Sequence, residues 1–211
     1  MVKKGGLLAI LALTVLIANP IKSYANLKKE SYLNKNLPIS KKFDLGLYEK
    51  DGQYYSNLSP AKKAHSFRDV FKTDDFSKDF DEVLFARMLL GEGEGMSELG
   101  KIENGYVALN RLFDIKKRWG KTIKEVLLQP NQFSSFEERK KRLEDPLKYN
   151  PKEFLECLTL SRDLLKGKYK DPTEGATHFF NPYLIKTPYW ANHMDEIKKI
   201  NTGPHRYYKE R

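Results

Sequence analysis

Apolar residues at helical spacing fill much of the chain over residues 79–167, and this pattern constrains the fold more than any other feature. Apolar positions that recur every third or fourth residue line one face of an α-helix, so they predict helices with one face against a core. Local signals agree, because Thr122 and Glu125 form a capping box and Asn150 before Pro151 is a helix start. We expect four helices, running from Phe80 to the glycines at 91–95, from Ser97 to about Lys117, from Thr122 to Leu128, and from Pro151 to Gly167.

The end of the chain has a different pattern. The stretches "ATHFFNP" (176–182) and "HRYYK" (205–209) are short and aromatic, which favours β-strands over helices. Helices followed by a few strands indicate an α+β fold. The sequence therefore predicts a helical domain with a small antiparallel β-sheet near its C-terminus.

Residues 1–25 have the pattern of a secretory signal peptide. Lys3 and Lys4 precede an uncharged run over 5–18, and small residues stand at Ser23 and Ala25. The run is shorter than the roughly 20 residues that span a bilayer, so a retained anchor is the weaker alternative. We expect cleavage near Ala25 and export to the periplasm or to the extracellular cell wall, with membrane contact only through the signal.

Three regions are predicted: the signal at 1–25, an N-terminal arm or linker at 26–78, and a catalytic domain at 79–211. The 211 residues, 40% of them hydrophobic, suffice for one modest core.

Removing the three lysines of the signal lowers the formal net charge from +10 to +7. A basic exported protein suits an anionic envelope polymer. Nucleic acid is not an expected partner, because no compact Lys/Arg block is interleaved with aromatic residues. The only cysteine, Cys157, has no partner for an internal disulfide.

Glu92 is the strongest catalytic candidate. It lies between Gly91 and Gly93, where the first predicted helix ends. Negative partial charge at a helix C-terminus disfavours ionisation, and an apolar cleft would raise the pKa further. A carboxylic acid that is neutral near pH 7 can donate a proton to a glycosidic oxygen. The flanking glycines would let an extended substrate approach the backbone. The simpler alternative is a solvated helix end with incidental acids.

Other residues are candidates for substrate binding. The segment "QPNQFSSF" offers amides, hydroxyls and aromatic rings, a mixture suited to sugars, although an ordinary turn with a buried Phe133 would also explain it. Trp190 could stack on a sugar ring or simply pack its own loop. We assign substrate binding to Gln132, Phe133, Ser134, His178, Asn181, Trp190 and His205.

A metal site is a weaker interpretation of the histidines. His178 and His205 could hold Zn²⁺ together with a carboxylate. No HExxH motif and no closely spaced pair of ligands supports this. We therefore predict no metal and no other cofactor.

Five segments taken in order resemble the SleB/CwlJ-like cell wall hydrolase family, which includes the spore cortex-lytic enzymes. They are "ARMLLGEGEG" (86–95), "GYVALNRL" (105–112), "VLLQPNQFSSF" (126–136), "DPTEGATHFFNP" (171–182) and "GPHRYYK" (203–209). The resemblance covers about residues 79–209. It implies a lysozyme-like or lytic-transglycosylase-like domain that cleaves the MurNAc–GlcNAc β-1,4 bond of peptidoglycan glycan strands. We expect the protein to be a monomer.

The same resemblance implies that Glu92 is the catalytic acid. As a lytic transglycosylase the protein would need one carboxyl group, because the 6-hydroxyl of MurNAc closes the product ring. The sequence departs from the family pattern G-E-A-R-G-E, with Glu94 in place of Arg and Met96 in place of the second Glu. Glu94 would either raise the pKa of Glu92 by like-charge repulsion or face solvent.

Two other functions stay open. An N-acetylmuramoyl-L-alanine amidase would use a metal held by His178, His205 and an acid. A non-catalytic envelope-binding protein would have lost activity through the altered loop after Glu92.

Overall fold

The computed structural model describes residues 47–50, 53–56, 69–197 and 202–211. The predicted signal peptide lies outside these residues, as does most of the predicted arm. Within the arm, strand β1 (Leu47–Lys50) pairs antiparallel with β2 (Gln53–Ser56). Among the described residues, no helix is long and apolar enough to cross a membrane.

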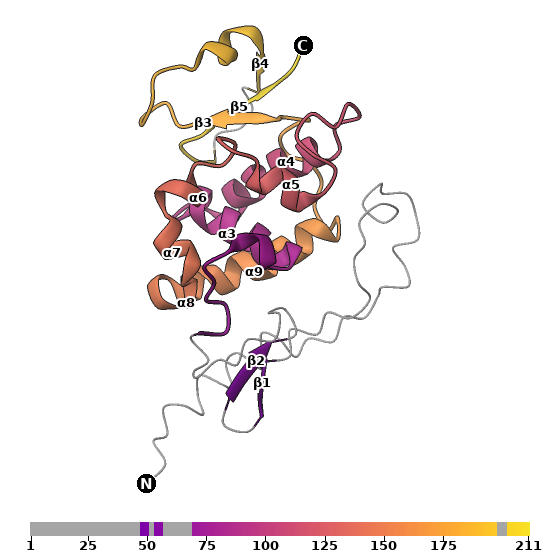
Figure 1. Cartoon of the computed structure of the whole chain (residues 1–211). Coiled ribbons are helices and arrows are strands. Elements are labelled where there is room, and N and C mark those ends of the chain that lie inside the picture. Colours follow the sequence, from indigo (N-terminus) through magenta and orange to yellow (C-terminus); the bar gives the residue numbers. More distant parts are fainter. Residues whose placement is uncertain (1–46, 51–52, 57–68, 198–201) are drawn as a thin grey trace.

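Three long helices form the body of the domain: α3 (Asp81–Gly93), α4 (Glu98–Leu112) and α9 (Pro151–Leu165). Helix α3 packs against both of the others (Figure 1). We expected α3 to turn a single face to the core, but every residue from Glu82 to Gly91 is buried. A helix that is apolar on most sides belongs in the middle of a domain. The burial of α3 therefore places its last turn, which carries Glu92, inside the protein.

The helix boundaries follow local signals. The side chain of Thr122 accepts a hydrogen bond from the amide of Glu125, and the capping box at the start of α5 (Ile123–Leu128) is confirmed. Helix α9 begins at Pro151 as predicted. Helix α4 ends at Leu112, earlier than expected, and Lys117 has a positive φ of 53° in the loop that follows.

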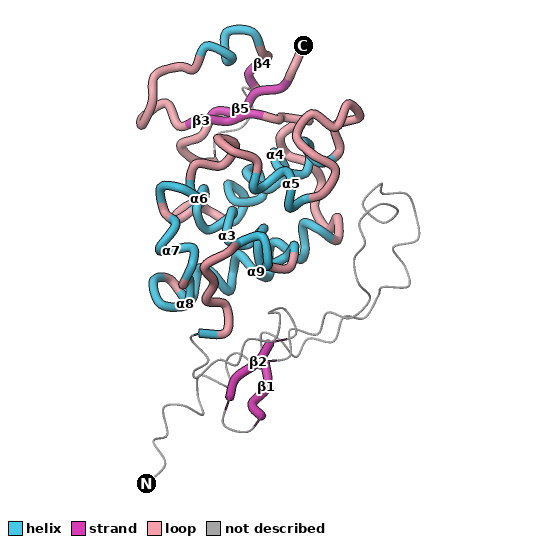
Figure 2. The backbone as a smooth tube through the Cα atoms, viewed as in Figure 1, coloured by secondary structure: helices cyan, strands magenta, loops and turns pink. Residues whose placement is uncertain are grey.

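Three short helices between α5 and α9 were not predicted: α6 (Ser135–Glu138), α7 (Lys140–Glu144) and α8 (Pro146–Tyr149). Each is too short to show a hydrophobic period. They pass along the side of the bundle, and α6 and α7 contact α3 (Figure 2). Through these contacts residues 135–149 cover the end of α3.

The C-terminal sheet has the strand order β3 (His178–Phe180), β5 (Arg206–Lys209), β4 (Asp195–Glu196) and is antiparallel. The prediction of an α+β domain with a small antiparallel sheet near the C-terminus is confirmed. The sheet covers one end of the helices (Figure 1). Phe179 pairs with Tyr207, and Tyr207 packs with Val107 of α4. The sheet is thus seated on α4.

Two neighbouring side chains of α4 attach the segment that leads into β3. The side-chain nitrogen Nδ2 of Asn110 donates to the Asp171 carboxylate at 3.0 Å and to the backbone carbonyl of Ala176 at 2.9 Å. Nε of Arg111 donates to the carbonyl of Thr177 at 2.7 Å. Two of the segments noted in the sequence therefore meet here and fix where the sheet begins.

The core extends before residue 79. Val70 and Phe71 are buried, and Nη2 of Arg87 donates to the carbonyl of Phe71 at 2.7 Å. Nε of the same guanidinium pairs with Asp79 at 2.6 Å. This buried arginine ties residues 69–79, including the short 3₁₀ helix η2 (Phe76–Lys78), to α3.

Candidate active site

Glu92 lies in the last turn of α3, with its carboxyl group turned into the protein. Its Oε1 accepts a hydrogen bond from the backbone amide of Ser135 at 3.0 Å. Burial raises the pKa of Glu92, and this outweighs the hydrogen bonding from Ser135 and the positive charge of Arg139, which lower it. The arrangement therefore favours the protonated acid more than a surface glutamate would.

The glycines around Glu92 allow other parts of the protein to approach. A Cβ atom on Gly91 would lie 2.4 Å from Oγ of Ser135, and one on Gly93 would lie 2.9 Å from Cγ of Lys101. We expected these glycines to admit substrate. Instead, Gly91 and Gly93 make room for the packing of α6 and α4 against α3. Gly95 differs, because it adopts a φ of +78° in open space and forms the turn.

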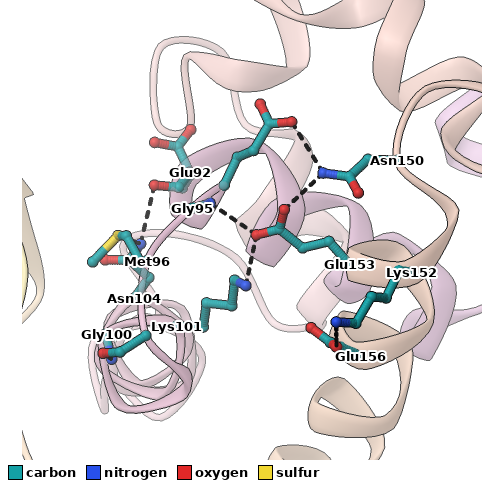
Figure 3. Close-up of polar contacts among 12 residues, drawn as sticks. Glu92, Gly95, Met96, Gly100, Lys101, Asn104, Asn150, Lys152, Glu153 and Glu156 are labelled. Atoms are coloured by element: carbon teal, nitrogen blue, oxygen red, sulfur yellow. Dashed lines mark hydrogen bonds and ion pairs between the residues drawn. The ribbon is translucent and has the colours of Figure 1, made fainter.

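Asn104 of α4 is fully buried below Glu92, and the sequence analysis missed it. Its Nδ2 donates to the backbone carbonyl of Glu92 at 3.3 Å (Figure 3). Its Oδ1 accepts from the hydroxyl of Tyr207 at 2.8 Å and lies 3.0 Å from Nδ1 of His205. The side chain of Asn104 therefore connects the end of α3 with His205, just before β5, and with Tyr207 in β5. No signal in the sequence separated Asn104 from the other polar residues of α4.

His205 and Phe133 join the same cluster. Burial lowers the pKa of His205 to about 4, so the ring is neutral near pH 7. The ring centroids of His205 and Phe179 are 4.7 Å apart, and those of Phe133 and Phe179 are 6.4 Å apart. The guanidinium of Arg111 lies 4.9 Å from the centroid of Phe133. Two of the predicted substrate-binding residues, the buried Phe133 and the partly buried His205, are thus brought together as packing partners of Phe179.

His178 and Trp190 lie on the other face of the sheet. Their ring centroids are 4.9 Å apart, and Trp190 also packs edge-on against Phe180 and Tyr208. Neighbouring residues of a strand point to opposite faces, so His178 points away from Phe179 and from the His205 ring beside it. The two histidines therefore cannot share a metal ion. Among the described residues no group of three or more His, Cys, Asp and Glu side chains is placed to hold one.

The remaining predicted residues have local positions. The carboxamide oxygen of Asn181 accepts from the amide of Tyr183 at 2.9 Å, which is a turn interaction. Gln132 closes a turn, because its backbone amide donates to the backbone carbonyl of Gln129 at 3.3 Å. Ser134 is exposed immediately before α6. Their role in substrate binding stays a prediction.

Glu94 faces neither of the environments we expected. Its carboxylate accepts from Nη1 of Arg139 at 3.0 Å and from Nη2 of Arg142 at 2.5 Å. Asn150 adds a contact at 3.3 Å. The negative charge of Glu94 is therefore balanced by two arginines from residues 135–144, which form the unpredicted helices α6 and α7.

A second set of polar contacts holds the same turn. Oε1 of Glu153 accepts from the amide of Gly95 at 2.9 Å and pairs with Nζ of Lys101 at 2.6 Å (Figure 3). Its other oxygen accepts from Asn150 at 2.7 Å. The contacts of Glu153 with Gly95 and Lys101 tie the turn to α4 and α9 without Glu94, while Asn150 contacts both glutamates.

A buried, readily protonated carboxyl group at the end of a central helix defines a candidate acid–base enzyme. The chain belongs to the Cell Wall Hydrolase family, whose model matches residues 95–208, more than half of the sequence. The predicted family membership is confirmed. The matched range begins at Gly95, so Glu92 lies just before it. Membership supports a peptidoglycan-degrading function and action outside the cytoplasm.

Two solved structures are similar. The catalytic domain of the Bacillus cereus SleB protein is 28% identical, with a TM-score of 0.46, and the match covers 61% of this chain and 89% of that one. The catalytic domain of the germination-specific lytic transglycosylase SleB from Bacillus anthracis is 23% identical, with a TM-score of 0.44, over 61% of this chain and 93% of that one. Comparison with curated proteins gives no match.

Proposed function

We propose that this protein is an exported lytic transglycosylase that cleaves the MurNAc–GlcNAc β-1,4 bond of peptidoglycan, with Glu92 as its single catalytic acid. The observation that carries the proposal is the buried carboxyl group of Glu92, which the amide of Ser135 holds in place while burial raises its pKa. A general acid for a glycosidic oxygen needs these properties.

The proposed reaction uses this group twice. Protonated Glu92 donates its proton to the glycosidic oxygen as the bond to the anomeric carbon of MurNAc breaks. The resulting carboxylate is stabilised by the Ser135 amide, and Arg139 contributes positive charge nearby. The Glu92 carboxylate then removes the proton from the MurNAc 6-hydroxyl, and the oxygen of that hydroxyl bonds to the anomeric carbon. Glu92 is protonated again, and the product carries a 1,6-anhydro ring.

Most glycosidases use a second carboxyl group beside the catalytic acid. Met96 stands where relatives have a second Glu, and its sulfur lies 3.7 Å from Nδ2 of Asn104. The carboxylate of Glu94 forms ion pairs with Arg139 and Arg142. A mechanism with one carboxyl group is therefore the one that these residues favour.

Mass spectrometry of purified sacculi digested with the wild type and with Glu92→Gln tests this proposal. We expect 1,6-anhydro-muropeptides from the wild type and a loss of about 10²- to 10⁴-fold with Glu92→Gln, the range for removal of a general acid. Glu156→Gln, on the exposed side of α9, is the matched control and should keep its activity.

Other products would point to other functions. Reducing MurNAc ends would indicate hydrolysis instead of ring closure. New L-alanine amino termini would indicate an amidase, and binding of sacculi without release would indicate a non-catalytic protein. Retained activity in Glu92→Gln would overturn the assignment of the acid.

Export and domain limits belong to the same proposal. Cleavage near Ala25 would be checked by N-terminal sequencing of the exported protein. The catalytic domain is proposed to begin near residue 79, but the buried Val70 and Phe71 pack on its core. A fragment for activity measurements should therefore start before Asp69. Sedimentation of that fragment tests the predicted monomer.

A further inference from the structure

Arg139 interacts electrostatically with two glutamates, Glu94 and Glu92. Arg139 pairs with Glu94 at 3.0 Å, and its positive charge also acts on the Glu92 carboxyl group. Arg142 pairs with Glu94 but is not among the charges that act most strongly on Glu92. The two arginines thus differ in what they would do if Glu94 released them.

We propose that Glu94 is a positioning residue that holds the guanidinium of Arg139 in an ion pair away from the Glu92 carboxyl group. The inference rests on the proposed function, because it concerns the acid that Glu92 would supply.

The charged groups around Glu92 come from several elements. Arg139, between α6 and α7, lowers the pKa of Glu92, and Glu138 of α6 raises it. Arg111 of α4 also interacts electrostatically with Glu92. The amide of Ser135 is a fixed donor. Among these groups Arg139 is exposed enough to move, since 41% of its side chain is accessible.

The turn does not depend on Glu94 for its shape. Glu153 holds the amide of Gly95 and also Lys101, and Asn104 holds the carbonyl of Glu92. Removing the charge of Glu94 should therefore leave the turn in place and release Arg139. A freed Arg139 beside Glu92 would stabilise the carboxylate and favour loss of the proton.

The test is the pH dependence of muropeptide release by the full chain, with variants Glu94→Gln, Arg139→Gln and Arg142→Gln. With Glu94→Gln we expect the basic limb of the profile to move to lower pH, so that activity falls several-fold above the wild-type midpoint and changes little below it. Arg139→Gln should move the limb to higher pH. Arg142→Gln is the matched control, which removes one ion pair of the same carboxylate and should not move the limb to lower pH. Glu94→Asp should restore the wild-type limb.

A double variant separates this proposal from direct repulsion between Glu92 and Glu94. If Glu94 acts through Arg139, Glu94→Gln has no further effect in the Arg139→Gln background. If Glu94 repels Glu92 directly, the same downward shift appears in both backgrounds, and the proposal is overturned. An unmoved limb in Glu94→Gln also overturns it. Activity in Glu92→Gln would instead refute the proposed function, so the two failures are distinct.

Discussion

Oδ1 of Asn104 lies 3.0 Å from Nδ1 of His205, and this contact joins two residues that are 101 positions apart in the sequence. Because a carboxamide oxygen only accepts, the neutral imidazole carries its proton on Nδ1. The same amide group holds the carbonyl of Glu92. The buried side chain of Asn104 therefore connects the sheet to the turn that carries Glu92.

Asn104→Leu should destabilise the domain and reduce its activity. The change removes the partner of His205 and of the Glu92 carbonyl, whereas the Tyr207 hydroxyl keeps its hydrogen bond with Glu103. An unsatisfied buried polar group costs about 1–3 kcal/mol. Urea unfolding measures the loss. Tyr207→Phe removes one of these donors and should cost less. Equal stability of Asn104→Leu and the wild type would contradict the role of the network.

Gly91→Ala should impair catalysis more than stability. The new methyl group would lie 2.4 Å from Oγ of Ser135, so α6 has to move and the hydrogen bond from the Ser135 amide to Glu92 is lengthened. We expect a loss of at least about tenfold in muropeptide release, equivalent to roughly 1.4 kcal/mol in the barrier. Gly95→Ala is the comparison. It meets open space but keeps φ at +78°, so it should cost about 1 kcal/mol of stability. Equal activity of Gly91→Ala and the wild type would refute the packing argument.

Asp79→Asn should be strongly destabilising. Asp79 neutralises Arg87, whose side chain is fully inaccessible to solvent. Breaking a buried ion pair from one side leaves an uncompensated charge and costs about 3–5 kcal/mol. Chemical denaturation would show it as a lower midpoint. The exposed cap Asp75 offers a control, since Asp75→Asn keeps a side-chain oxygen that can accept from Ser77 and should cost far less stability. Similar losses in the two variants would argue against the buried pair.

Glu92→Gln should stabilise the domain at neutral pH. Since burial raises the folded-state pKa of Glu92, its contribution to stability is complete below the unfolded-state pKa and is lost as pH rises through the folded value. Glutamine keeps the oxygen that accepts from Ser135 and carries no charge at any pH. Calorimetry should therefore find a Tm difference in favour of Glu92→Gln that grows from pH 4 to pH 8. A difference that does not change with pH, or one that favours the wild type at pH 8, would show that burial does not perturb this carboxyl group.

Local features of the sequence were sufficient for several parts of the fold. The capping box at Thr122, the start at Pro151 and the strands around His178 and Arg206 depend on residues close together in the chain, and all were predicted. Family membership followed from the order of the five segments. Glu92 was singled out because its glycine neighbours mark the end of a helix.

The environment of Glu92 was decided by the tertiary structure alone. The donor to its carboxyl group is Ser135, 43 positions away, and Arg139 reaches Glu94 across 45 positions. Residues 135–149 carry no hydrophobic period, so neither partner could be anticipated. The opposite orientations of His178 and His205 follow from strand register, which argues against the alternative of a metal held by both histidines. Helix periodicity and caps are local and readable in the sequence, whereas the pKa of a buried acid depends on contacts that only the folded chain brings together.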